Sequence, residues 1–154
     1  MLRLLFCVSL IAMAGQASAQ ERQWTLDSSD KQVFLVFGVP DTADVGVSFW
    51  CDIGTPKVSL FVPLPHSQVR PGERRDISAH VDGKLFSFKG RAEKDAATGL
   101  INVEAPFQQN DAFLKAVAAG EILDFDIDHQ HVAYPLADAD FAGFKSACAG
   151  DEVN

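Results

Sequence analysis

Short apolar runs separated by turn-forming residues follow one another along most of the chain. Residues 45–53 (VGVSFWCDI) alternate apolar with more polar side chains, and residues 57–62 (KVSLFV) do the same after a turn at 54–56. A period of two is typical of half-buried β-strands, so these segments predict an antiparallel hairpin. Residues 32–39 (QVFLVFGV) are apolar on both faces, as expected of a central strand.

A second hairpin is predicted where Asp82-Gly83 separates residues 76–81 from residues 84–91. Asp-Gly between two alternating runs is a strong hairpin signal, because both positions of the tight turn need positive φ angles. Similar patterns predict further strands over residues 100–103, 121–127 and 132–136.

Two short helices are predicted late in the chain. Residues 111–119 (DAFLKAVAA) follow Asn110 or Asp111 as a helix cap. Residues 139–148 form the second helix, for which Asp138 is the expected cap. The pattern of strands and helices therefore predicts a mainly β fold: an antiparallel sandwich or open barrel with one inserted short helix and a C-terminal helix.

The first 19 residues have the three parts of an export signal. Arg3 provides the positive charge, residues 4–14 are apolar, and Ala17-Ser18-Ala19 provides small residues before a cleavage point. The apolar run is shorter than the roughly 20 residues that a membrane span needs. We expect residues 1–19 to be a cleaved signal peptide, residues 20–154 to form a single β-rich domain without a transmembrane segment, and the location to be the periplasm or, alternatively, the extracellular space.

Cysteine usage agrees with an oxidising compartment. Of the three cysteines, Cys7 lies in the expected signal peptide, which leaves Cys51 and Cys148. Two cysteines in an exported domain allow one intramolecular disulfide, and no C-x-x-C motif indicates a redox function. Closing so long a loop would contribute about 4–5 kcal/mol in the chain-entropy description.

Charge makes nucleic acid an unexpected partner, because the formal net charge of the chain is −8. Basic residues nevertheless gather between positions 70 and 99. A basic face there could contact an anionic partner, and a solvated surface of mixed charge is the alternative. The residues predicted for an anionic contact are Arg70, Arg74 and Arg75.

An acidic and histidine-rich stretch is the candidate metal site. Asp124, Asp126 and Asp128 would point to one side of a strand, followed by His129 and His131. These groups could bind a divalent cation, the one cofactor that the sequence suggests. The alternative is a charged edge strand, which protects a sheet against aggregation.

No motif identifies an enzyme. The sequence has no G-x-S-x-G or S-x-x-K pattern, and His66 and His80 are interpreted as surface or packing residues. Most of the aromatic residues are Phe, which is typical of core filling, although a binding surface that uses Trp24 or Trp50 is a second interpretation.

The positions of Trp24, Cys51 and Cys148, with the segment Tyr134-Pro135-Leu136-Ala137 leading into Phe141 and Phe144, resemble a loose group of small exported proteins of Gram-negative bacteria. Most of that group have no assigned function. The resemblance implies a periplasmic location and no particular activity or catalytic residue.

Three functions remain open from the sequence. The first is a non-catalytic binding or interaction module of the cell envelope, with another envelope protein as its possible partner. The second is a divalent-metal-binding protein or metal-dependent hydrolase that uses the 124–131 stretch. The third is a structural accessory of envelope assembly.

Overall fold

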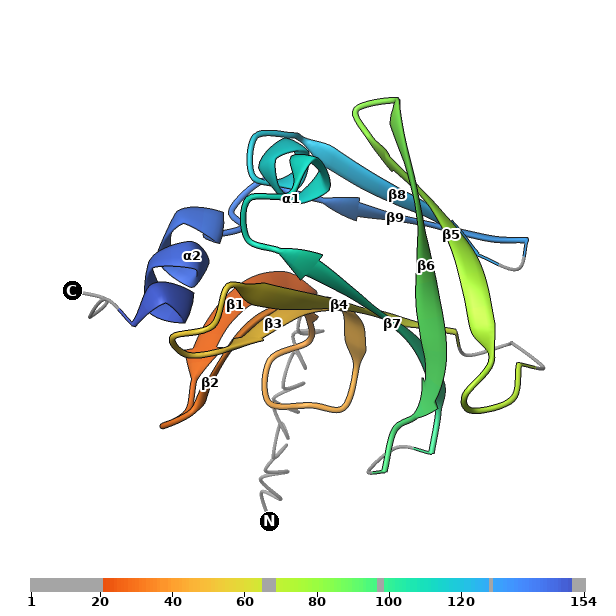
Figure 1. Ribbon diagram of the computed structural model, residues 1–154, viewed down its shortest axis with the longest axis horizontal. Coiled ribbons are helices and arrows are strands. Elements are labelled where there is room, and N and C mark those ends of the chain that lie inside the picture. Colours follow the sequence, from red (N-terminus) through yellow and green to blue (C-terminus); the bar gives the residue numbers. More distant parts are fainter. Residues whose placement is uncertain (1–20, 65–68, 97–98, 128, 151–154) are drawn as a thin grey trace, which may run out of the picture.

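Nine antiparallel strands form one sheet in the computed structural model, which describes residues 21–64, 69–96, 99–127 and 129–150 (Figure 1). The sheet curls around a core, so the predicted mainly β architecture is confirmed as an open half-barrel. The expected signal peptide lies outside the described residues. The strands are β1 (Gln23–Ser28), β2 (Gln32–Gly38), β3 (Val45–Asp52), β4 (Lys57–Pro63), β5 (Arg74–Val81), β6 (Lys84–Lys94), β7 (Ile101–Gln108), β8 (Ile122–Ile127) and β9 (Gln130–Pro135).

The strand order is β1-β2-β3-β4-β7-β6-β5-β8-β9. Both predicted hairpins are present, as β3–β4 and β5–β6. In the second, Asp82 and Gly83 have φ angles of 48° and 80°, as a tight hairpin turn requires. The Asp82 carboxylate also accepts hydrogen bonds from the backbone N–H groups of Glu121 and Ile122, both at 3.1 Å or less. This turn therefore also holds the start of β8.

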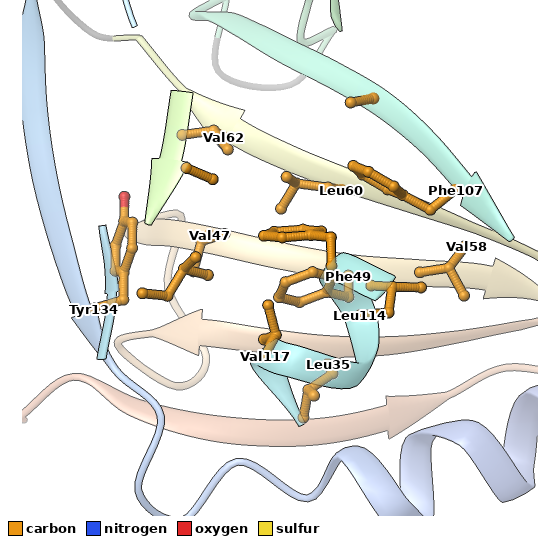
Figure 2. Packing of buried hydrophobic residues seen from close by; sticks show 14 of the residues in the cluster. Leu35, Val47, Phe49, Val58, Leu60, Val62, Phe107, Leu114, Val117 and Tyr134 are labelled. Atoms are coloured by element: carbon orange, nitrogen blue, oxygen red, sulfur yellow. The ribbon is translucent and has the colours of Figure 1, made fainter. Parts of the chain in front are cut away.

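The core lies on the inner face of the curl, where alternate residues of the strands are buried (Figure 2). In β3, Val47, Phe49 and Cys51 are almost inaccessible to solvent. Phe125 and Ile127 of β8 are likewise buried, at 1% and 2% exposure. The period of two seen in the sequence therefore separates the core from the outer face of the sheet.

The described residues also form two helices, α1 (Ala112–Val117) and α2 (Phe141–Ala149). Asp111 caps α1 as predicted, since its side chain accepts from Phe113 N–H. The cap of α2 is Asp140, whose Oδ1 accepts from Gly143 N–H at 2.8 Å. The prediction of Asp138 as the cap is wrong, because that residue has a φ of 66° and lies in the turn before the helix.

Side chains, rather than a backbone ladder, bridge the open side of the curled sheet. Trp24 Nε1 on β1 donates to the Pro135 carbonyl on β9 at 2.6 Å. The Tyr134 hydroxyl on β9 donates to the Gly46 carbonyl on β3 at 2.8 Å. A Cβ at Gly46 would lie 2.9 Å from the Tyr134 ring, so a glycine is needed for this close approach. These contacts hold the sheet edges near one another.

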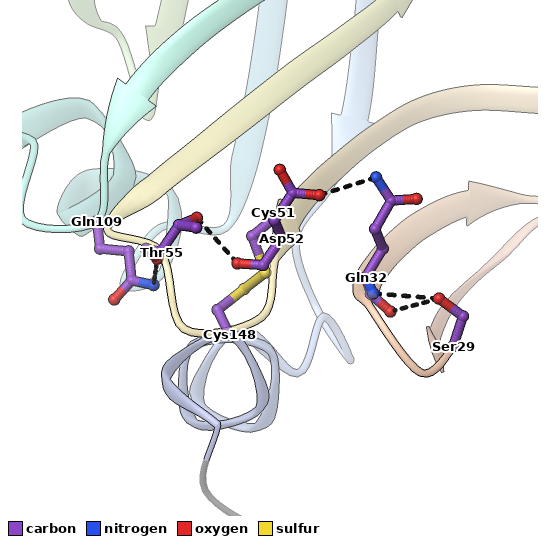
Figure 3. Close-up of a disulfide and its surroundings, with 7 residues drawn as sticks. All are labelled: Ser29, Gln32, Cys51, Asp52, Thr55, Gln109 and Cys148. Carbon is purple, nitrogen blue, oxygen red and sulfur yellow. Dashed lines mark hydrogen bonds between the residues drawn. A yellow bond between two sulfur atoms is a disulfide. The ribbon is translucent and has the colours of Figure 1, made fainter.

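The predicted disulfide is present between Cys51 on β3 and Cys148 on α2 (Figure 3). Its Cα atoms are 5.9 Å apart. The Cys148 carbonyl also accepts from Gly54 N–H in the β3–β4 turn, at 2.8 Å. The C-terminal helix is thereby fixed to a central strand 97 residues earlier in the chain.

Replacing both cysteines by alanine should lower the free energy of unfolding by about 2–5 kcal/mol, because the unfolded chain regains the entropy of an unclosed loop. Urea denaturation of the wild type and of the Cys51→Ala/Cys148→Ala variant measures this difference. Hydrogen exchange should show that α2 loses more protection in the variant than any other element does. Equal protection of α2 in both proteins would contradict the role given to the disulfide.

Because Tyr134 is buried, we expect the folded protein to lose stability at alkaline pH. Burial raises the pKa of its hydroxyl from 10.0 to about 12, and the positive charge of Arg22 opposes that rise only in part. The folded protein thus holds the phenol proton more tightly than the unfolded chain does. The corresponding stability is fully present below pH ~10 and should fall by about 3 kcal/mol as the pH rises through ~12.

Tyr134 is the single tyrosine of the chain, so tyrosinate absorbance follows its ionisation without interference. Tyr134→Phe is the matched control: it loses the hydrogen bond to Gly46 at every pH but should lack the extra alkaline decline. An ordinary tyrosine titration in the folded wild type would contradict the burial argument.

Candidate binding surface on the outer face of the sheet

The side chains that alternate with the core residues form the outer face of the sheet. On this face, strand pairing aligns Phe34, Trp50, Ser59 and Pro106 across β2, β3, β4 and β7. A neighbouring row continues further, from β2 to β5. Its members are Val36, Ser48, Phe61, Glu104, Arg91 and Arg74.

One half of the outer face is aromatic. Phe34, Trp50 and Phe61, which we call the aromatic strip, point away from the core and are half-buried. The solvent side of an antiparallel sheet is usually polar, so outward aromatic residues on three adjacent strands indicate a contact surface. Residues 32–39 are therefore apolar on both sides for two reasons: one side faces the core, and the other forms part of this strip.

The other half of the outer face is of mixed charge, with a basic pair among acidic residues such as Asp76, Glu93 and Glu104. Arg74 on β5 lies directly opposite Arg91 on β6, and both side chains are exposed. Within the part of the chain that the structure describes, neither forms an ion pair, although Glu104 is the next residue across from Arg91. A shallow groove of about 210 Å³ lies here. Its lining is Arg74, Lys89, Gly90, Arg91, Glu104 and Pro106.

The structure divides the three arginines that the sequence suggested for an anionic contact. Arg74 is on the outer face, whereas Arg75 is half-buried and its Nη2 lies 2.5 Å from Glu73 Oε2. Arg70 is exposed in the segment before β5. Register places Arg91 beside Arg74 instead, and Lys89 lines the same groove while pairing with Asp76 at 2.5 Å.

The predicted metal ligands lie on the β8–β9 hairpin. Asp124 and Asp126 point outward, and Asp124 Oδ1 is 3.7 Å from His131 Nε2. Asp126 is opposite His131 in the register, and His129 is an exposed turn residue with a φ of 63°. Asp128, like His66, lies outside the described residues. Among the residues that are described, no three His, Cys, Asp or Glu side chains are arranged to hold a metal ion, so the metal site stays a prediction.

The two tryptophans have different surroundings. Trp24 packs on the inside, with its ring centroid 5.4 Å from Phe37 and 5.9 Å from Phe141. Trp50 faces outward in the aromatic strip. The suggested tryptophan binding surface therefore applies to Trp50, while Trp24 closes the end of the core. His80 also lies on the outer face, opposite Asp124 on the next strand.

The protein is thus a curled antiparallel sheet with one disulfide, and its outer surface combines three aromatic side chains with a region of mixed charge. Of the helices in the described segments, none has the length and apolarity needed to cross a membrane. No protein-family model matches the chain, and neither does any curated protein.

The chain is similar to a solved structure, the crystal structure of invasion associated protein B from Bartonella henselae. The two sequences are 15% identical, the TM-score is 0.46, and the match covers 82% of this chain and 96% of that one. An identity of 15% and a TM-score of 0.46 are both too low to transfer a function.

Arg74→Glu should raise the free energy of unfolding by about 0.5 kcal/mol, because it replaces a like-charge cross-strand pair by an opposite-charge pair. Denaturation at low ionic strength measures the gain, which added salt should diminish. Arg70→Glu makes the same charge change away from Arg91 and serves as the control. A loss of stability in Arg74→Glu would show that Arg74 and Arg91 do not repel one another.

Proposed function

We propose that this protein is a non-catalytic binding module of the periplasm that contacts another envelope protein through the outer face of its sheet. The single observation that carries the proposal is that the aromatic strip and the Arg74–Arg91 pair share one face of the sheet, with only β7 and its Glu104 between them. Tryptophan and arginine are among the residues most enriched at the energetic centres of protein interfaces. Here both occur on one continuous sheet surface.

The extent of this face suits a protein partner. Six adjacent strands carry the row from Val36 to Arg74, and at ~4.8 Å between strands the row spans about 24 Å. Such a length fits one side of a standard interface, which buries about 800 Å² per partner. The groove of about 210 Å³ beside it is shallow and charged, which suits an acidic side chain.

The chemistry of the face specifies the complementary surface. A partner would place apolar side chains on Phe34, Trp50 and Phe61, and carboxylates against Arg74 and Arg91. Because the chain as a whole is acidic, with a net charge of −8, this basic patch would also orient an acidic partner during its approach.

The rigidity of the sheet supports binding without a conformational change. Hydrogen bonds connect strands on both sides of the opening, and the disulfide fixes α2 to β3, so the outer face would lose little freedom when a partner binds. Metal-dependent chemistry at residues 124–131 and an accessory role in envelope assembly, the two other functions predicted from the sequence, are the alternative proposals.

Affinity capture from a periplasmic extract tests the proposal with two outer-face variants, Trp50→Ala/Phe61→Ala and Arg74→Glu/Arg91→Glu. Each should reduce recovery of the same partner at least tenfold, since loss of one interface centre costs about 2 kcal/mol or more. Quantitative mass spectrometry of the captured proteins gives the measurement.

Matched controls change the same chemistry elsewhere. Ile53→Ala/Leu100→Ala removes two exposed apolar side chains, and Lys31→Glu/Lys94→Glu reverses two exposed charges. Both should capture the partner as the wild type does. A partner retained by the outer-face variants, or no partner from wild-type bait, would overturn the proposal.

A further inference from the structure

A small apolar cleft lies on the opposite side of the molecule from the outer face, between the two helices. It has a volume of about 80 Å³. Leu114 of α1 and Phe141 and Phe144 of α2 form its walls, and Val58 of β4 contributes from the sheet. The Gln109 amide at the same cleft donates to the Thr55 carbonyl at 3.1 Å, which fixes that part of the wall.

Two lysines line this apolar cleft, Lys115 from α1 and Lys145 from α2. They are the only lysine or arginine residues between positions 100 and 154, a region that has ten acidic residues. Both side chains are exposed, and within the described residues neither forms an ion pair. Two ammonium groups at one apolar opening repel one another unless an anion lies between them.

We infer that the cleft between α1 and α2 binds a small aliphatic monocarboxylate. The alkyl group enters between Leu114, Phe141 and Phe144, and the carboxylate lies at the opening between the ammonium groups of Lys115 and Lys145. The volume of about 80 Å³ exceeds several times the ~10–15 Å³ that one water requires, so it accommodates a short alkyl chain.

The fold holds both walls of this site in place. α2 is joined to β3 by the disulfide, and the Phe141 ring packs edge-on against Phe49, with centroids 5.1 Å apart. On the other wall, Phe113 anchors α1 among the rings of Phe88 and Phe107, each with a centroid 5.1 Å away. The cleft is therefore preformed, and binding requires little reorganisation.

Titration of the full folded protein with hexanoate tests the inference. The Trp50→Phe background leaves Trp24 as the single tryptophan, and its ring is 5.9 Å from Phe141 in the cleft wall. Hexanoate should produce a saturable change in Trp24 fluorescence and a rise in melting temperature. 1-Hexanol has the same alkyl chain without the charge and should bind about tenfold more weakly.

Two variants locate the site. Lys115→Ala/Lys145→Ala should weaken hexanoate about tenfold and leave 1-hexanol unchanged. Ala118, the C-cap residue of α1, also lines the cleft, so Ala118→Leu should fill it and abolish saturation by both ligands. Lys31→Ala/Lys94→Ala and Ala149→Leu are the matched controls, and circular dichroism checks that every variant is folded.

Several outcomes would overturn the inference: no saturable signal from hexanoate in the wild type, equal affinities for hexanoate and 1-hexanol, or unchanged affinity in the double lysine variant. Saturation retained in Ala118→Leu would place the ligand elsewhere and overturn it equally. Arg74→Glu/Arg91→Glu should bind hexanoate normally, so this test and the capture experiment on the outer face can fail independently.

Discussion

The structure depends on one constraint: the curled sheet does not close on itself, so side chains and a helix must cover its inner face. Backbone hydrogen bonds connect β1 to β9 through seven intervening strands, but the two edge strands are not paired with one another. Trp24 and Tyr134 bridge the opening through their polar atoms, while their rings pack on Phe37. One pair of aromatic residues thus satisfies polar groups and also fills the core at the same place.

The disulfide holds a second element, α2, at the same opening. α2 comes last in the chain and packs beside β2, where its Phe141 contacts both Trp24 and Phe49. A short terminal helix is prone to fraying unless something fixes it. The Cys51–Cys148 bond provides that attachment, so the helix remains over the inner face and forms one wall of the cleft.

Local sequence patterns predict most of the strands and helices, because neighbouring residues determine where these elements begin and end. Alternation in residues 45–53 and the Asp82-Gly83 turn follow from backbone geometry, which nearby residues determine. The same patterns do not predict β1, because Trp24 and Leu26 are its only large apolar side chains and its pairing with β2 supplies the remaining order. They also misplace the cap of α2 by two residues, because Asp138 and Asp140 are equally good caps in isolation.

The candidate surface depends on pairing between distant strands, which local patterns do not contain. Arg74 and Arg91 are 17 positions apart, and Trp50 and Phe61 come from different strands. The sequence suggests Arg75 beside Arg74, but adjacent residues in a strand point to opposite faces. The spacing of Lys89 and Arg91, two positions apart in one strand, is the local signal that could have indicated Arg91.

The outer face also carries features that folding alone does not require. The like-charge pair Arg74–Arg91 opposes sheet stability, and outward aromatic residues leave apolar surface in water. A sheet selected only for stability would have opposite charges and polar side chains at these positions. These two unfavourable features lie on the same face of the sheet, separated by β7, and they support the proposed contact with another molecule.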